Sequence, residues 1–277
     1  MRSSAIKVGR PEAAGIDFTS MFAHARAKIY GARLHTHNLS IGWEGWVEHN
    51  ANVIAGVEAK APGCVYDPLN IMLPIEALLA VGDAVHSIRS SLDYLISALA
   101  RRASMSDSSA SFPLHEKRAG VEAAFVPPKG GKSKGATTYR LLNHYPDLKS
   151  VVVDVVRPFP IEDGGSPIGD LLWRIGGADN IDKHRLIMPV AQSAFARKAA
   201  FNNPMGGSLV IENIGFHGGS PFDLSASKPD PYNDLTFDML FSEPTRLADK
   251  PVLSALVEGC EAAEEVVKIF EAHFEGK

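Results

Sequence analysis

A continuous apolar seam between Pro74 and Arg102 is the sequence feature that most constrains the fold. Apolar residues recur there at alternating steps of three and four, which is the period of one helix face. The seam consists of Leu78, Val81, Val85, Ile88, Leu92, Leu95 and Leu99. Pro74 suits the first turn of a helix, where its missing N–H would have no intrahelical partner. The spacing predicts one long helix in the core, with Gly82 as a weak position.

The same stretch carries a polar stripe beside the apolar seam. Asp83, His86, Arg89 and Asp93 follow one another at steps of three and four residues, so their side chains are neighbours on a helix. One interpretation is a set of exposed ion pairs, each stabilising the helix by a few tenths of a kcal/mol. The other is a functional site at the border of the buried seam. The sequence leaves both open.

A second dense group of polar residues lies between Asp170 and Pro189. Residues 180–185 read Asn-Ile-Asp-Lys-His-Arg, and apolar residues flank them on both sides. A charge run is usually a solvated face, but these flanks favour partial burial. Buried charges need partners, so we expect Asp182, Lys183 and His184 to meet the polar stripe of the first helix.

Other segments predict further helices and a set of strands. Residues 12–31 have the pattern of a helix that ends at Gly31, and residues 251–274 that of a closing amphipathic helix. Residues 34–60 alternate and are rich in β-branched and aromatic side chains, which favours a β-hairpin. Alternation also predicts strands over Ser208–Phe216 and Asp234–Phe241.

The segments between these elements carry further expectations. Phe112-Pro113-Leu114 lies between two loop-like stretches and is expected to pack back on the body. The apolar run Val151–Val156 is expected to be a helix or a strand. Gly176-Gly177 interrupts the apolar pattern between Asp170 and Pro189, and residues 218–234 are expected to form a long loop.

The resulting fold class is α+β. We expect a bundle of four or five helices with a small antiparallel sheet packed at one side. The chain is expected to be a single domain over residues 1–277, with its helical core at about 74–188 and 251–275. The β elements are expected at about 34–60 and 207–242.

Composition limits the function classes. The chain has 45% hydrophobic and 22% charged residues, as is usual for soluble proteins. No apolar run has the length of a membrane span, and residues 1–15 contain no apolar signal core, so a cytoplasmic protein is expected. The net charge of −4 argues against broad non-specific nucleic-acid binding. Cys64 and Cys260 are expected to be reduced and structural.

Several motifs of cofactor and metal sites are weak or missing. His35 and His37 would share one face of a strand, but two ligands fall short of the usual three or four. Gly131-Lys132-Ser133 is similar to the end of a phosphate-binding loop, yet Val126 stands where its first glycine belongs. The chain has no G-x-S-x-G or G-x-G-x-x-G pattern. The sequence therefore predicts no cofactor and no metal.

Two strings together carry a resemblance. The run from Gly82 to Leu95 resembles the GD-xx-HN-LRSALDHL helix of a group of uncharacterised bacterial proteins. Phe112-Pro113 and residues 180–185 match the group's FP and N-x-DKHR strings in the same order. The match covers roughly residues 74–188, and it implies membership of a bacterial family to which no activity is attached.

More distantly, the helix resembles HEPN domains, which are helical bundles that often act as metal-independent ribonucleases. In that family an arginine and a histidine on one helix, spaced as Arg-x4-His and usually paired across a dimer, bind and cleave the RNA phosphate. Arg89 matches the arginine, whereas Tyr94 stands at the histidine position. The resemblance implies RNA as a partner and a homodimer as the assembly.

Two hypotheses of function follow from the polar groups. In the first, the protein is a hydrolase that acts on a phosphodiester or another substrate, with RNA or a small anionic ligand as its partner. An arginine would hold the anion, a histidine would act as general acid or base, and carboxylates would orient them. The residues concerned are Arg89, His86, His184, Asp93, Asp182 and Lys183, and a metal-dependent variant would use Asp83, His86, Asp93 and His184 as ligands.

The second hypothesis is a non-enzymatic helical scaffold, or a ligand-binding or interaction protein. Arg89, Asp93, Asp182 and Arg185 would then form a buried ion network that fixes helix packing, as perturbed charges do in structural networks as well as in active sites. A site requires Arg89 and His184 to face a cleft, whereas a network requires them to be saturated by Asp93 and Asp182.

Overall fold

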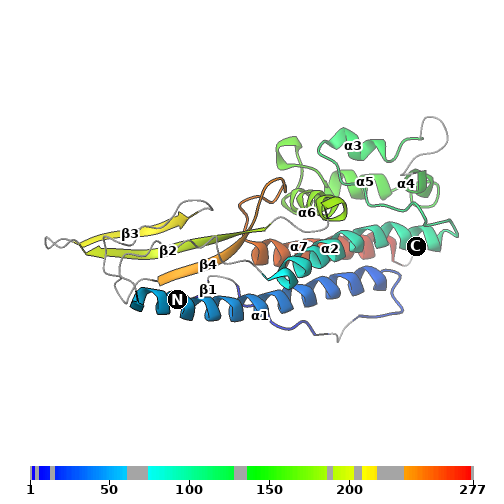
Figure 1. Ribbon diagram of the computed structural model, residues 1–277. Helices are drawn as coiled ribbons and strands as arrows, with labels where there is room; N and C mark the ends of the chain where they lie inside the picture. The colour runs from blue at the N-terminus through cyan, green and yellow to red at the C-terminus, as the bar shows by residue number, and fades with distance from the viewer. Residues whose placement is uncertain are drawn as a thin grey trace.

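The described part of the chain is mostly helical, and its long helices form a bundle (Figure 1). A computed structural model describes residues 2–3, 6–12, 16–60, 74–127, 136–185, 190–202, 208–216 and 234–275. The long helices are α1 (Ala23–Lys60), α2 (Ile75–Arg102), α6 (Pro167–Arg185) and α7 (Val252–Phe274). Helix α2 packs against each of the other three, so it is the central element of the bundle.

The seam predicted on α2 is confirmed as its buried face. Six of its seven apolar residues are buried: Val81, Val85, Ile88, Leu92, Leu95 and Leu99. Pro74 lies just outside the first turn, at the N-cap, with φ −58° and ψ 135°. The periodicity located this helix because a continuous apolar face can be buried in only one orientation.

Helix α1 corrects two predictions from the sequence. Residues 34–60 are helical, so the predicted β-hairpin is wrong, and the helix expected to end at Gly31 continues through it. Leu39, Trp43 and Val47 are spaced by four and all are buried, which is the helical period. Packing of this face on the bundle outweighs the β-propensity of the individual residues.

The helical conformation also changes the position of the histidine pair in α1. His35 and His37 are two residues apart, so on a helix they point in nearly opposite directions. His37 Nδ1 donates a hydrogen bond of 2.7 Å to the carbonyl oxygen of Val8. The shared face expected for a metal pair is therefore wrong.

Helix α7 closes the bundle as predicted. Its Phe270 ring lies 6.1 Å from Phe22 and 6.0 Å from Phe112, measured between ring centroids. The start of α1, the segment after α2 and α7 therefore share one aromatic cluster. Cys260 on this helix is a free thiol, as expected, and burial raises its pKa to about 12.

Short helical elements connect α2 to α6 and lie beside both (Figure 1). In chain order they are α3 (Arg118–Ala123), α4 (Ala136–Leu141), α5 (Leu148–Ser150), a π-helical turn (Val151–Val156) and a 3-10 turn (Ile161–Asp163). The apolar run at 151–156, for which a helix and a strand were both open, is helical. Phe112, expected to anchor the segment after α2, is 1% exposed.

The strands extend from one end of the bundle (Figure 1). They are β1 (Arg2–Ser3), β2 (Val190–Asn202), β3 (Ser208–Phe216) and β4 (Asp234–Phe241), in the order β1-β4-β2-β3. Strand β2 pairs antiparallel with β3 and β4, and β1 pairs parallel with β4. The strands predicted at 208–216 and 234–241 are present with those bounds.

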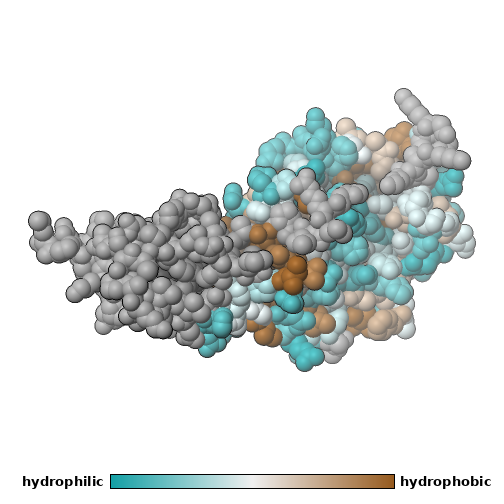
Figure 2. All heavy atoms as spheres, in the orientation of Figure 1, coloured by the Kyte–Doolittle hydropathy of each residue, from teal (hydrophilic) through white to brown (hydrophobic). Residues whose placement is uncertain are grey.

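Some predicted features lie outside the described residues. These are the segment Gly131-Lys132-Ser133, Cys64 and nearly all of the long loop 218–234. Among the helices of the described ranges, none combines the length and apolarity that a membrane span requires. Figure 2 shows hydrophilic side chains over much of the described helical surface, with smaller apolar patches between them.

Candidate functional site

The polar stripe of α2 divides into two groups one helical turn apart. Arg89 and Asp93 form one group with the segment after α2, and His86 forms the other with α6. Among the ion pairs of the described residues, none joins the two groups. The single cluster expected from the sequence is therefore two clusters with different surroundings.

The first group is a closed hydrogen-bond network around Arg89. One guanidinium nitrogen, Nη2, lies 2.9 Å from Asp93 Oδ1, and it donates to Ser111 Oγ at 2.9 Å and to the carbonyl oxygen of Phe112 at 3.0 Å. Asp93 Oδ1 in turn accepts the Phe112 amide at 2.8 Å and the Ser111 hydroxyl at 3.2 Å. The network fastens the backbone at residues 111–112 to the middle of α2.

The other terminal nitrogen of Arg89, Nη1, takes no part in this hydrogen-bond network. Nη1 is occluded and has no hydrogen-bond partner within the described part of the chain. The side chain as a whole is only 13% exposed. An unsatisfied buried donor carries a desolvation cost of about 1–3 kcal/mol, so an acceptor supplied by a ligand at this position would be stabilising.

The second group centres on Asp179, whose side chain is 1% exposed. Its two carboxylate oxygens are held separately: Oδ1 lies 2.9 Å from His86 Nδ1, and Oδ2 lies 2.6 Å from Lys183 Nζ. Because a carboxylate only accepts, His86 donates from Nδ1. The side chains of His86 and Lys183 are about half exposed, so both partners reach from the surface to the buried carboxylate of Asp179.

Asp182 lies beside this second group. Burial, together with the nearby carboxylates of Asp179 and Asp83, raises the pKa of Asp182 above its ordinary value, and His86 and Lys183 partly offset that effect. The residue opposite it on α2 is Gly82, where a Cβ would lie 2.8 Å from Asp182 Oδ1. Gly82, a weak position for helix propensity, thus allows α6 to approach α2 closely.

The expected site residues are therefore only partly united. The structure brings His86, Lys183 and Asp182 together, and it places Arg89 and Asp93 elsewhere on α2. The side chain of His184 lies outside the described residues. Asp179 was missed by sequence reasoning, although its spacing of four from Lys183 is the helical ion-pair spacing and was a usable signal.

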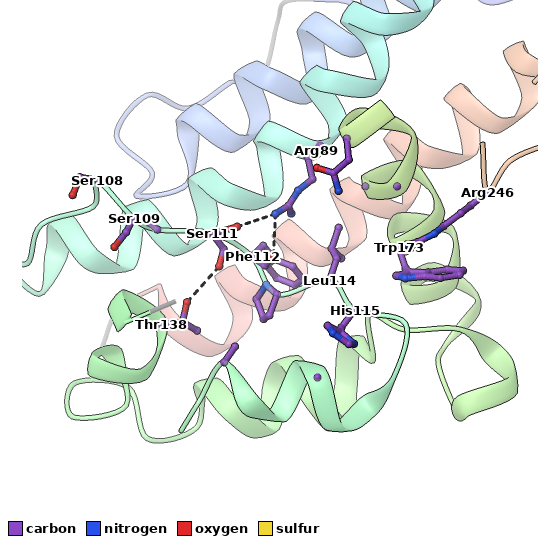
Figure 3. A pocket seen from close by; sticks show the side chains of 17 residues that line it. Arg89, Ser108, Ser109, Ser111, Phe112, Leu114, His115, Thr138, Trp173 and Arg246 are labelled. Carbon is purple, nitrogen blue, oxygen red and sulfur yellow. Dashed lines mark hydrogen bonds between the residues drawn. The ribbon is translucent and has the colours of Figure 1, made fainter. Parts of the chain in front are cut away.

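A cleft of about 480 Å³ opens beside Arg89 (Figure 3). It lies between α2, α6, the segment 108–115, α3 and the connection from β4 to α7. Its lining residues are Arg89, Ser108, Ser109, Ala110, Ser111, Phe112, Pro113, Leu114, His115, Gly120, Ala124, Thr138, Trp173, Gly176, Gly177, Asn180 and Arg246. The second group on α2, around His86, does not border this cleft.

Basic and neutral polar groups line the cleft. Arg89, Arg246 and His115 contribute to its wall, and its described lining contains no aspartate or glutamate. The Arg246 guanidinium lies over the Trp173 ring, 4.3 Å from the centroid, a cation–π geometry. Figure 3 shows the two side chains stacked at one end of the cleft.

Two glycines of α6 make room for the cleft wall. A Cβ at Gly177 would lie 2.8 Å from Arg246 Cδ, and one at Gly176 would lie 2.6 Å from Leu114 Cδ1. The Gly-Gly pair therefore lets both side chains lie against the helix. In the sequence this pair was only an interruption of an apolar pattern.

A glycine and a backbone amide position the side chain of His115. Its ring rests on Gly120, where a Cβ would come within 2.0 Å of Nδ1. Nδ1 accepts a hydrogen bond of 3.2 Å from the Lys117 amide, so a neutral ring carries its proton on Nε2. His115 follows closely after the predicted Phe112-Pro113 anchor, so the sequence offered a signal that this histidine lies near the core. Arg246 lies in an irregular segment whose sequence offers no such signal.

Metal coordination finds no support in the described ranges, which contain no group of three or more histidine, cysteine, aspartate or glutamate side chains arranged to hold an ion. Comparison with protein-family models, with curated proteins and with solved structures gives no match to this chain. Function is therefore inferred from the geometry of the cleft.

Proposed function

We propose that this protein binds a small anionic ligand in the cleft between α2, α6 and residues 108–115. The observation that carries the proposal is the lining of the cleft by Arg89, Arg246 and His115 without a carboxylate among its described residues. Asp93, the acid of the network, pairs through Oδ1 with Arg89 Nη2 and accepts the Phe112 amide and the Ser111 hydroxyl at the same oxygen, so Arg89 Nη1 stays unpaired among the described residues. The positive charge of Arg246 has no carboxylate partner among the described ion pairs.

The chemistry of the ligand follows from these groups. Guanidinium groups bind the oxygens of phosphates and carboxylates with charge-assisted hydrogen bonds. The hydroxyls of Ser108 and Ser109 on the cleft wall can add neutral donors, whereas those of Ser111 and Thr138 already donate within the protein. The volume of about 480 Å³ is in the range of sites for small molecules. A metabolite-sized compound with a phosphate or carboxylate group fits this description.

Hydrolysis of a phosphodiester, as a HEPN-like ribonuclease would perform it, is the second candidate function. The observation that favours it is the presence of His115 in the cleft that Arg89 lines. In the structure His115 Nδ1 accepts the Lys117 amide. Protonation of Nδ1 replaces that hydrogen bond, and the resulting imidazolium can transfer its Nε2 proton as a general acid. His86 is hydrogen-bonded to Asp179 outside the cleft, so His115 replaces it in this proposal.

Calorimetric titration tests the binding function. The probes are inorganic phosphate, pyrophosphate and citrate, titrated into the full chain and into Arg246→Met. Methionine keeps an apolar stem beside Trp173 and removes the charge. Affinity is expected to fall about tenfold, equivalent to about 1.4 kcal/mol.

The matched control is Lys268→Met, which removes the same charge from an exposed position on α7. It is expected to leave the affinity unchanged. An equal loss of affinity in Lys268→Met would mean that the effect of Arg246→Met comes from the overall charge of the protein and not from the cleft. Absence of binding by all three probes at millimolar concentration would overturn the proposal.

Cleavage of single-stranded RNA in the presence of EDTA tests the second candidate. A general acid contributes on the order of a hundredfold or more to the rate, so His115→Ala should lose at least that much. His273→Ala on α7 is the matched control, because that ring bonds within its own helix. Equal rates in both variants, or no cleavage by the unmodified chain, would exclude His115 as a catalytic residue.

A further inference from the structure

A second hollow adjoins the cleft. It has a volume of about 600 Å³, and its described lining includes Ser108, Ser109, Thr137, Arg140 and His144. Ser108 and Ser109 line both hollows. Between them, the Ser109 hydroxyl is hydrogen-bonded to the Thr137 hydroxyl at 2.8 Å. The boundary between the two hollows is therefore made of small hydroxyl side chains.

The second hollow repeats the electrostatic character of the first. Arg140 and His144 are its ionisable side chains, and no carboxylate occurs among its described lining residues. Asp107, which lies in the same serine-rich segment, is paired with Arg101 at 2.8 Å and borders neither hollow. The one acid of this segment is thus held outside the hollows.

One arginine in each hollow, Arg246 in the cleft and Arg140 in the second hollow, takes part in no described ion pair. Six other arginines do have carboxylate partners, including Arg89 in the cleft: Arg26, Arg33, Arg89, Arg101, Arg118 and Arg174. Exposed guanidinium groups normally gain little from such pairs, so their absence costs little stability. It leaves two positive charges available, one in each hollow.

We infer that the ligand is elongated and carries two anionic groups, one held in the cleft by Arg89 and Arg246 and the other held by Arg140 and His144. This inference rests on the proposed binding function and names the class of ligand. The linking part of the ligand crosses the hydroxyls of Ser108, Ser109 and Thr137. Figure 3 shows Ser111, Ser109 and Ser108 leading away from Arg89 along this route.

Two anion subsites at a fixed separation should make affinity depend on the length of the ligand. When two linked groups bind two sites, the second binding event is intramolecular, and its gain is largest when the linker matches the span. A ligand too short to reach Arg140 gains nothing from it. Affinity should therefore rise sharply at one linker length and then decline slowly as the linker is extended.

The test uses α,ω-alkanediol bisphosphates, from propanediol to decanediol, and the alkyl monophosphate of each length as the matched single-anion probe. Calorimetry with the full chain is expected to show at least a tenfold gain of one bisphosphate over its monophosphate. Arg140→Met should abolish that gain. Arg246→Met should weaken both kinds of probe.

The outcomes separate the two proposals. Binding of monophosphates with no gain for any bisphosphate would overturn the second subsite and leave the binding function standing. A bisphosphate gain that survives in Arg140→Met would also overturn it. Failure of every probe to bind would overturn the binding function itself. Lys268→Met is again the charge control. If this variant lost the bisphosphate gain to the same extent as Arg140→Met, the gain would depend on the overall charge of the protein and not on the second hollow.

Discussion

The two polar groups on α2 use similar residue types one helical turn apart, yet their surroundings differ. Arg89 is 13% exposed and is tied to the backbone at residues 111–112. His86 is about half exposed and reaches inward to the buried carboxylate of Asp179. In the first group the cation is buried and borders a cleft, whereas in the second group the anion is buried. The buried member of each pair therefore decides which substitution is costly.

The largest effect is expected from Arg89→Ala. Truncation leaves the Asp93 carboxylate and the Phe112 carbonyl without their cation, in a partly buried position. The free energy of unfolding should fall by roughly 2–4 kcal/mol, somewhat less than for a fully buried pair because Asp93 is partly exposed. Urea unfolding followed by tryptophan fluorescence measures this loss.

His86→Ala is the comparison for that variant and should lower the free energy of unfolding by less than about 1 kcal/mol, since Lys183 still pairs with Asp179. Equal losses in the two variants would mean that burial of the cation does not distinguish the groups.

A smaller effect is expected from combining His86→Ala with Lys183→Ala. Each single change leaves Asp179 one hydrogen-bonding partner, but the double change leaves a carboxylate that is 1% exposed without either. The double variant should lose about 1–3 kcal/mol more than the sum of the singles. Adding Asp179→Asn should recover part of the loss, because it removes the unpaired charge. Simple additivity in the urea titrations would contradict the shared role of Asp179.

The smallest effect concerns Asp182 and depends on pH. Its pKa is raised by burial and by the carboxylates of Asp179 and Asp83, so the folded protein holds this proton more tightly than the unfolded chain. The resulting stability is fully present below the ordinary pKa of about 3.8 and is lost as pH rises through the folded pKa.

Asp182→Asn should therefore gain stability relative to the unmodified chain as the pH increases from acidic to neutral. Unfolding free energies of both proteins, measured across that interval, provide the check. A difference that stays constant with pH would show that the two states bind the Asp182 proton equally.

Local pattern was sufficient for the elements that bury one continuous face. The seam of α2, the face of α7 and the alternating strands at 208–216 and 234–241 were found from the sequence, because helix and strand periods differ and long runs separate them. The Phe112 anchor was found for a related reason, since an apolar pair between polar segments has to pack back on the core.

Tertiary structure alone decided the rest. Residues 34–60 carry β-branched and aromatic side chains that suit a strand, and only packing of Leu39, Trp43 and Val47 against the bundle makes them a helix. The division of the polar stripe depends on Asp179 and on the segment at Phe112, which approach α2 from other parts of the chain. Arg246 reaches the cleft because Gly177 leaves room beside Trp173. Sequence periodicity reports which face of an element is buried, whereas partners and clefts arise from contacts between segments far apart in the chain.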